Sequence, residues 1–158
     1  MSPSPQSRIW IYQAGRNLSD AEVSICRKEL SAFVPGWTAH DQLLTAGFDV
    51  RYNRFIILWV DETQAGASGC SIDKSVREIK KLEQMLGINL FNRLDIGRLQ
   101  EDGSVATASR EQMSELLDQG VVNAGTKVFN NTVQTLAEFE NSWIIPYSES
   151  WAYPRTAS

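Results

Sequence analysis

A run of small residues at positions 66–73 contains the side chains of this sequence that are best placed to do chemistry. It follows an apolar run at 55–60 and precedes an amphipathic helical pattern that begins near Lys74. Small residues let backbone N–H groups gather at a helix N-terminus, where the partial positive charge favours an anion or a thiolate. We therefore expect this loop to bind a small anionic ligand or a protein partner, with Ser68, Gly69, Ser71 and Asp73 as ligand-binding residues.

Cys70 lies in the same run, and the chain has one histidine, His40. A thiolate at a helix N-terminus is a nucleophile, and an imidazole beside it can accept its proton. The sequence thus leaves open a cysteine-dependent enzyme in which Cys70 and His40 are catalytic. The competing interpretation is structural: Cys70 is a small residue required by tight packing, and His40 is a hydrogen-bonded neighbour of Trp37. We favour this second interpretation, and whether the protein is an enzyme stays open.

Metal sites have weaker support in the sequence. Asp61, Glu62 and Asp73 offer the hard oxygen ligands that Mg²⁺ and Ca²⁺ prefer, but no loop has regular ligand spacing. Two cysteines and one histidine, spread widely along the chain, do not make a structural zinc site. We therefore expect neither a metal nor a cofactor.

Length and composition predict a single globular domain over residues 1–158, with 42% hydrophobic and 22% charged residues. A net charge of −4 and a pI near 5.0 argue against nucleic acid as a partner, because affinity for phosphate chains needs clustered Lys and Arg. No apolar window approaches the length of a membrane span. A cytoplasmic location with both cysteines reduced is the expectation.

Six elements are expected in the first part of the chain: strands at 8–13, 48–53, 55–60 and 88–93, and helices at about 20–33 and 72–86. Ser19 and Glu22 have the spacing of a capping box that opens the first helix. Gly87 can take the left-handed conformation that ends the second. The order βαββαβ predicts an α+β, ferredoxin-like core over residues 8–95.

The strand at 55–60 is apolar at six successive positions, so both of its faces should be covered. Two helices on one side of a four-stranded sheet leave the other side bare. The C-terminal extension, residues 96–158, is the candidate cover. It has signals for a strand at 103–107, a helix from Ser109 to Gly120 and a helix from Thr132, followed by large aromatic side chains that bury well.

The predicted strand directions bring distant residues to one end of the sheet. Trp37, His40, Asp61, Cys70 and Arg93 are expected there together with the loop at 66–73. Arg8 and Glu62 should join this rim, whereas Arg16 and Tyr52 should lie at the opposite end. We expect Trp37, Asp61 and Arg93 to complete the ligand-binding site.

The segment 68–73, of sequence SGCSID, occurs with Trp37 and His40 upstream and with VFNN at 128–131 and Ser150-Trp151 downstream. In these features the chain resembles an uncharacterised family of small bacterial proteins, some of which are labelled ABC transporter ATPases. The resemblance covers most of the chain and implies no catalytic residues. A phosphate-binding loop requires a glycine before its Lys-Ser pair, and here Asp73 precedes Lys74 and Ser75.

Overall fold

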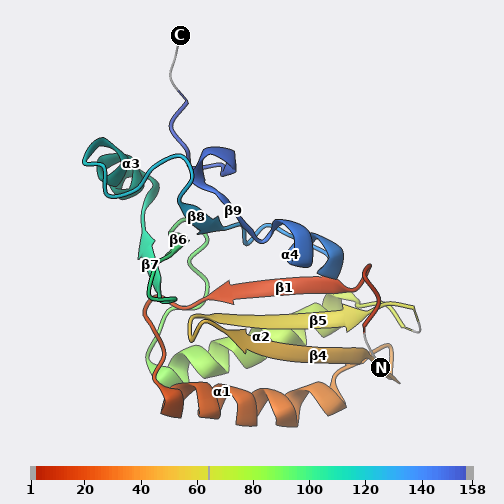
Figure 1. Ribbon diagram of the computed structural model, residues 1–158. Helices are drawn as coiled ribbons and strands as arrows, with labels where there is room; N and C mark the ends of the chain where they lie inside the picture. Colours follow the sequence, from red (N-terminus) through yellow and green to blue (C-terminus); the bar gives the residue numbers. More distant parts are fainter. Residues whose placement is uncertain (1–2, 64, 156–158) are drawn as a thin grey trace.

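The computed structural model describes residues 3–63 and 65–155 and has the α+β class that the sequence predicts (Figure 1). No helix of the described residues is long and apolar enough to cross a membrane. The elements in chain order are β1 (Arg8–Gln13), α1 (Asp20–Phe33), η1 (Val34–Gly36), β2 (Thr38–Ala39), β3 (Gln42–Leu43), β4 (Thr45–Arg51), β5 (Phe55–Asp61), α2 (Gly69–Leu86), β6 (Ile96–Leu99), β7 (Val105–Ala108), α3 (Arg110–Asp118), β8 (Lys127–Phe129), α4 (Leu136–Ser142), β9 (Ile144–Pro146) and η2 (Tyr147–Glu149).

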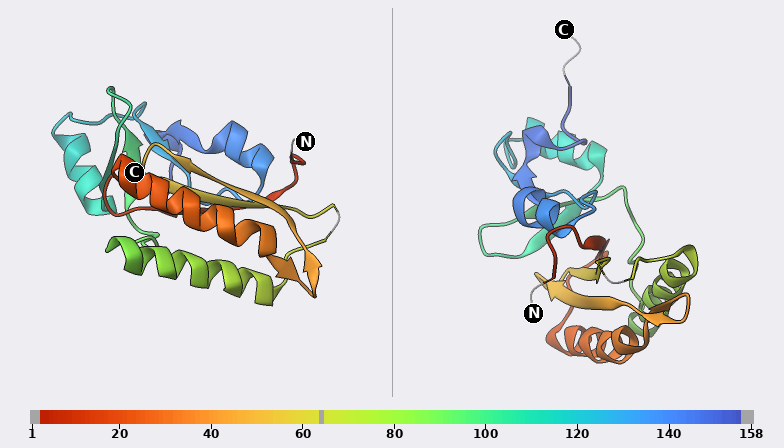
Figure 2. Two further views of the ribbon diagram at one scale, coloured as in Figure 1. Left: turned by 90° about the horizontal axis from the view of Figure 1, so that it is seen from below. Right: turned by 90° about the vertical axis from the view of Figure 1, so that its right-hand side faces the viewer.

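The first sheet has the order β1-β5-β4, and both pairs of neighbouring strands are antiparallel. Helices α1 and α2 cover one of its faces, as Figures 1 and 2 show. Leu30 of α1 and Ile79 and Leu82 of α2 are fully buried against Ile56 and Leu58 of β5. The apolar stripe of each helix and the continuous apolar run of β5 therefore form one core.

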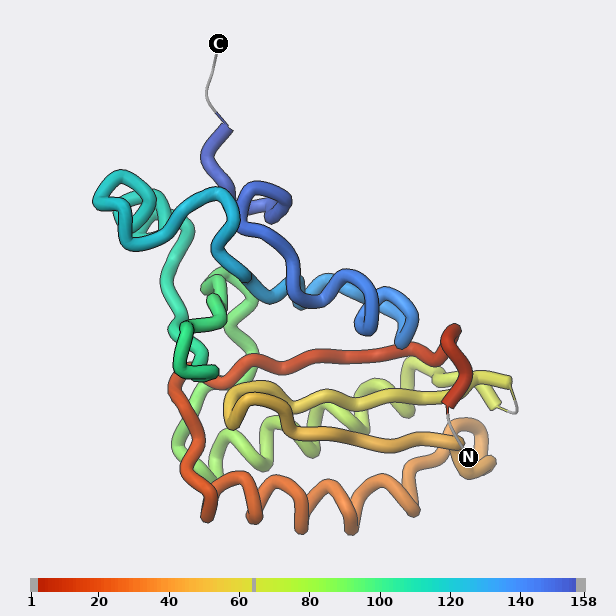
Figure 3. Tube along the Cα trace, in the orientation of Figure 1, coloured from red at the N-terminus to blue at the C-terminus, as the bar shows by residue number. Residues whose placement is uncertain are grey.

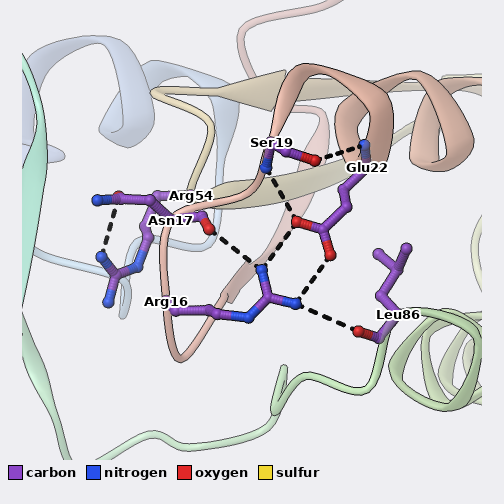
Figure 4. Close-up of polar contacts among 6 residues, drawn as sticks. All are labelled: Arg16, Asn17, Ser19, Glu22, Arg54 and Leu86. Atoms are coloured by element: carbon purple, nitrogen blue, oxygen red, sulfur yellow. Dashed lines mark hydrogen bonds and ion pairs between the residues drawn. The ribbon is translucent and has the colours of Figure 1, made fainter.

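The start of α1 is held by the capping box that the sequence predicts (Figure 4). Ser19 Oγ accepts the Glu22 N–H, and the Glu22 carboxylate accepts the Ser19 N–H. Both Nη atoms of Arg16 donate to that carboxylate at 2.8 Å, and Nη2 also donates to the carbonyl of Leu86 at the end of α2. These hydrogen bonds lower the pKa of Glu22 to about 2, with the Arg16 guanidinium as the main cause.

We predict that Glu22→Gln removes part of the dependence of stability on pH. Because the pKa of Glu22 falls from 4.5 to about 2 on folding, its contribution is present above pH 4.5 and is lost as pH falls toward 2. Urea unfolding should therefore show the variant less stable than the wild type at pH 7, with the two converging near pH 2. The exposed Glu115, changed to Gln, is the control. A difference in the free energy of unfolding between Glu22→Gln and the wild type that stays constant from pH 7 to pH 2 would contradict the prediction.

The second face of the sheet is covered by the C-terminal part of the chain, as expected for β5 (Figure 2). Ile9 and Ile11 of β1 and Phe55 and Ile57 of β5 point to this face. They pack against Phe129, Val133, Phe139 and Trp143, all buried. The extension also forms its own antiparallel sheet, of order β7-β6-β8-β9, which packs with α3 around the fully buried Met113 and Tyr147.

The fourth strand predicted at 88–93 is wrong. Two asparagines bend this segment instead: Asn89 Oδ1 accepts the N–H groups of Phe91 and Asn92, and Asn92 Oδ1 accepts those of Leu94 and Asp95. Such side-chain bonds offer the backbone an alternative to a strand ladder. The sheet therefore has three strands rather than the four of a ferredoxin-like core, and β1 is an edge strand.

Candidate functional site

The loop at 66–73 lies at the start of α2, where side chains of the loop itself accept hydrogen bonds from its backbone N–H groups. Ser68 Oγ accepts the Ser71 N–H at 3.2 Å, and Ser71 Oγ accepts the Ser68 N–H at 2.7 Å. The Glu62 carboxylate accepts the Ala67 N–H at 2.9 Å. A negative charge therefore already lies against this loop, and it opposes the binding of an anion. Gly69 and Asp73 are exposed beside it.

The segment that contains Trp37 and His40 packs next to this loop, as the strand directions predict. The indole of Trp37 is buried, and its Nε1–H donates to the carbonyl of Ser71 at 2.8 Å. Lys74 Nζ donates to Thr38 Oγ1 at 3.1 Å. Trp37 thus has a structural position, fixing the β2–β3 hairpin against the start of α2.

Asp61 was also expected at this rim, and Arg16 at the opposite end of the sheet. Asp61 ends β5, and its carboxylate accepts the N–H groups of Ser4 and Thr63. These bonds lower the pKa of Asp61, with the Thr63 backbone N–H as the largest cause. Arg16 contacts the last turn of α2 and so lies at the far end of that helix from Cys70, as expected.

Cys70 and His40 are both exposed, His40 in the turn between β2 and β3 with a φ of 50°. Among the described residues no hydrogen bond joins them. Their catalytic roles stay a prediction. Cys26, by contrast, is fully buried in the core between α1 and the sheet, and burial raises the pKa of its thiol to about 11.

We predict that iodoacetamide modifies Cys70 at least tenfold faster than Cys26 in the native protein at pH 7.5, because a buried thiol with a raised pKa is slow to react. Peptide mass spectrometry over a time course gives both rates. His40→Ala tests the enzyme hypothesis separately, since slower modification of Cys70 in that variant would indicate that His40 accepts the proton of its thiol. Equal rates at the two cysteines would contradict the exposure seen here.

Arg93 does not lie at the rim where the sequence placed it. Its Nη1 donates to the carbonyl of Ile11 at 2.8 Å, and its guanidinium lies 5.3 Å from the ring centre of Tyr12. The cause is the missing fourth strand, because the bent segment brings Arg93 across the outer edge of β1. This residue belongs to a different site from the loop at 66–73.

A cavity of about 390 Å³ opens at that outer edge of β1. Three separate segments form it: β1 itself, residues 92–95 and residues 131–134, with Trp151 beside them. Figure 3 shows how the C-terminal part of the chain runs alongside β1. The Trp151 side chain is 52% exposed and also lines a neighbouring cavity with Arg155.

Side-chain amides build one wall of this cavity. Gln13, at the end of β1, is buried; its Nε2 donates to the carbonyl of Asp95 at 3.1 Å, and its Oε1 accepts from Asn131 Nδ2 at 3.2 Å. Asn131 Oδ1 in turn accepts the Nε1–H of Trp143 at 2.9 Å. This chain of hydrogen bonds fixes the amide positions, as a preorganised polar site requires.

The backbone edge of β1 is interrupted inside the cavity. The Ile9 N–H faces away from β5 and donates to the carbonyl of Gln134 at 3.0 Å. Backbone groups of alternate residues point the same way, so those of Ile11 face outward too, and its carbonyl accepts from Arg93. The Ile9 carbonyl and the Ile11 N–H lie between these two contacts, with no partner among the described residues.

Sequence reasoning named Arg8 and Arg93 but missed the amides, among them the buried Gln13 and the half-buried Asn131. The one local signal was the pair of asparagines at 130–131 directly after an apolar run. The described residues contain no group of three or more His, Cys, Asp or Glu side chains that could hold a metal ion.

Comparison with known proteins gives no match: no family model, no curated protein and no solved structure matches the chain. The resemblance based on the SGCSID segment therefore stays a prediction.

Proposed function

We propose that the protein binds a small anionic ligand in the cavity at the outer edge of β1. The observation that carries this proposal is the pair of guanidinium groups, Arg8 and Arg93, that line the cavity beside the interrupted strand edge. Arg8 is held over the Trp10 ring at 4.9 Å, and its Nε is 3.8 Å from Glu62 Oε1, a long ion pair at a half-exposed position. Such a pair contributes little and leaves the guanidinium accessible to a ligand.

The charge balance of the cavity supports an anion. Among the lining residues, two carry a positive charge and one, Asp95, carries a negative charge. The Asp95 carboxylate accepts from Asn92 Nδ2 at 2.9 Å, which engages it within the wall. A volume of about 390 Å³ suits a small molecule rather than a large cofactor. Guanidinium groups bind carboxylates and phosphates well because their planar N–H groups match two oxygen atoms.

Anion binding was also expected from the sequence, but at the loop 66–73 rather than at the edge of β1. At the loop 66–73, serine side chains and the Glu62 carboxylate engage the backbone donors. At β1, the Ile11 N–H and two guanidinium groups face a cavity. Electrostatic attraction for an anion is therefore stronger at β1.

Thermal shift over a panel of small carboxylates and phosphates tests the proposal, because a ligand that binds the native state raises its stability. We expect at least one anion to raise the melting temperature of the wild type, and Arg93→Gln to weaken its binding about tenfold or more. Each variant is compared with and without the anion, since Arg93 also bonds to Ile11. The exposed Arg77, changed to Gln, is the matched control. Equal losses in both variants, or no stabilising anion at all, would overturn the proposal.

A further inference from the structure

The unpaired backbone groups at the edge of β1 restrict the ligand more than the charges of Arg8 and Arg93 do. The Ile9 carbonyl is an acceptor, the Ile11 N–H is a donor, and Trp10 lies between them. In a parallel β pair, one residue donates its N–H to the residue before its neighbour and accepts the N–H of the residue after it. One residue opposite Trp10 would therefore satisfy both groups. An antiparallel partner bonds both of its groups to a single residue and cannot do so.

We infer that the ligand is an N-acylated amino acid, bound opposite Trp10 as a single residue parallel to β1, and this inference rests on the proposed function. Its amide N–H donates to the Ile9 carbonyl, and one oxygen of its carboxylate accepts the Ile11 N–H. This places the carboxylate beside the Arg93 guanidinium, which already lies 2.8 Å from the Ile11 carbonyl oxygen. A charge-assisted bond from Arg93 then distinguishes a carboxylate from an amide.

The segment after β8 limits the length of the ligand. The Gln134 carbonyl accepts the Ile9 N–H, and Arg8 forms a β bridge with Thr135. The strand edge before Ile9 is therefore already paired, and a peptide that continued along β1 from the bound residue would meet this segment. A long chain on the N-terminal side of the bound residue would meet Gln134 and Thr135, which favours a small molecule over the end of a protein chain.

The side chain of the bound residue should be acidic. Residues opposite each other in a sheet point to the same face, so this side chain lies on the face of Trp10. Arg8 shares that face and lies over the Trp10 ring at 4.9 Å. A side-chain carboxylate could reach the Arg8 guanidinium, whereas a basic side chain would be repelled. N-acetyl-L-glutamate is accordingly the probe of choice.

Titration of the ¹⁵N-labelled full chain with N-acetyl-L-glutamate tests the inference, because the Ile11 amide resonance reports the new hydrogen bond. We expect saturable shifts at Ile11. The N-methyl analogue, which lacks the N–H for the Ile9 carbonyl, should bind about tenfold or more weakly. Nα-acetyl-L-lysine, which keeps a basic side chain, and an acetylated tetrapeptide that ends in glutamate should also bind more weakly than N-acetyl-L-glutamate. Arg93→Gln should lose affinity in the same assay, and Arg77→Gln should not.

The outcomes separate the two proposals. Equal binding of the N-methyl analogue, or an unmoved Ile11 resonance in a saturated complex, overturns the strand-like pairing and leaves anion binding in place. Tighter binding of the tetrapeptide overturns the small-molecule assignment in favour of a peptide end. If N-acetyl-L-glutamate fails while another anion stabilises the wild type through Arg93, the ligand class is wrong and the proposed function stands. If no anion binds, the proposed function itself fails.

Discussion

Arg54→Met should lower the free energy of unfolding by about 3–5 kcal/mol. Arg54 is 4% exposed and has no carboxylate within ion-pair distance among the described residues. Its guanidinium instead donates to the carbonyls of Ala14 and Val105 and to the side chains of Asn17 and Thr107, at 2.6–3.0 Å. Methionine fills a similar volume but leaves these acceptors, some of them buried, without a donor.

Arg54 connects three parts of the fold, which explains the expected size of this effect. It lies in the β4–β5 turn, and its partners lie in the approach to α1 and in β7 (Figure 4 shows the contact with Asn17). Burial also lowers the pKa of the guanidinium, which records the desolvation cost that these hydrogen bonds offset.

Urea unfolding at pH 7 gives the comparison, with Arg77→Met as the control. Arg77 is exposed, so its change should alter stability by less than about 0.5 kcal/mol. Thr107→Val removes one acceptor and should cost less than Arg54→Met. If Arg54→Met is as stable as Arg77→Met, the interior tolerates the unsatisfied carbonyls and the argument from hydrogen bonding is wrong.

Local sequence signals explain which elements could be predicted. The capping box of Ser19 and Glu22 and the left-handed Gly87, with a φ of 63°, set helix ends at the expected residues. The six apolar residues of β5 predicted a strand covered on both faces, which the structure confirms. In each case the residues that carry the signal are close together in the chain.

The segment 88–93 and the residue Arg54 show where such signals fail. Three of the six residues at 88–93 are apolar, which favoured a strand, but Asn89 and Asn92 bond to the backbone that a strand would have used. Arg54 lies between the strands predicted at 48–53 and 55–60, and no local signal indicates that it is buried. Its burial depends on β7, which lies about fifty residues further along the chain.

The site shows the same limit. Sequence reasoning placed Trp37 beside the start of α2 correctly, because strand directions determine which ends meet. The cavity at β1 could not be found that way, since it needs residues 92–95 and 131–134 beside one strand edge. That edge is open because the predicted fourth strand does not form beside β1. The same difference from the predicted fold therefore creates the proposed site.

Truncation after Gly120 should abolish cooperative unfolding and cause aggregation. It removes Phe129, Val133, Phe139 and Trp143, which cover the face of the sheet formed by β1 and β5. Phe55 alone has ring centres of Phe129 and Trp143 at 4.6 and 5.0 Å. Removing them exposes a contiguous apolar surface on the sheet, and such surfaces drive association. Size-exclusion chromatography and urea unfolding followed by circular dichroism measure both effects.

Two point variants separate loss of this cover from loss of chain length. Trp143 is 3% exposed and donates a hydrogen bond to Asn131, whereas Trp151 is 52% exposed, so the same change to Ala compares a buried tryptophan with a half-exposed one. Trp143→Ala should cost about 3–5 kcal/mol, and Trp151→Ala less than about 1 kcal/mol. Trp151→Ala should still weaken anion binding, because Trp151 lines the cavity at β1. A truncated protein that stays monomeric with an unchanged transition would show that the sheet folds without its cover and would contradict the prediction.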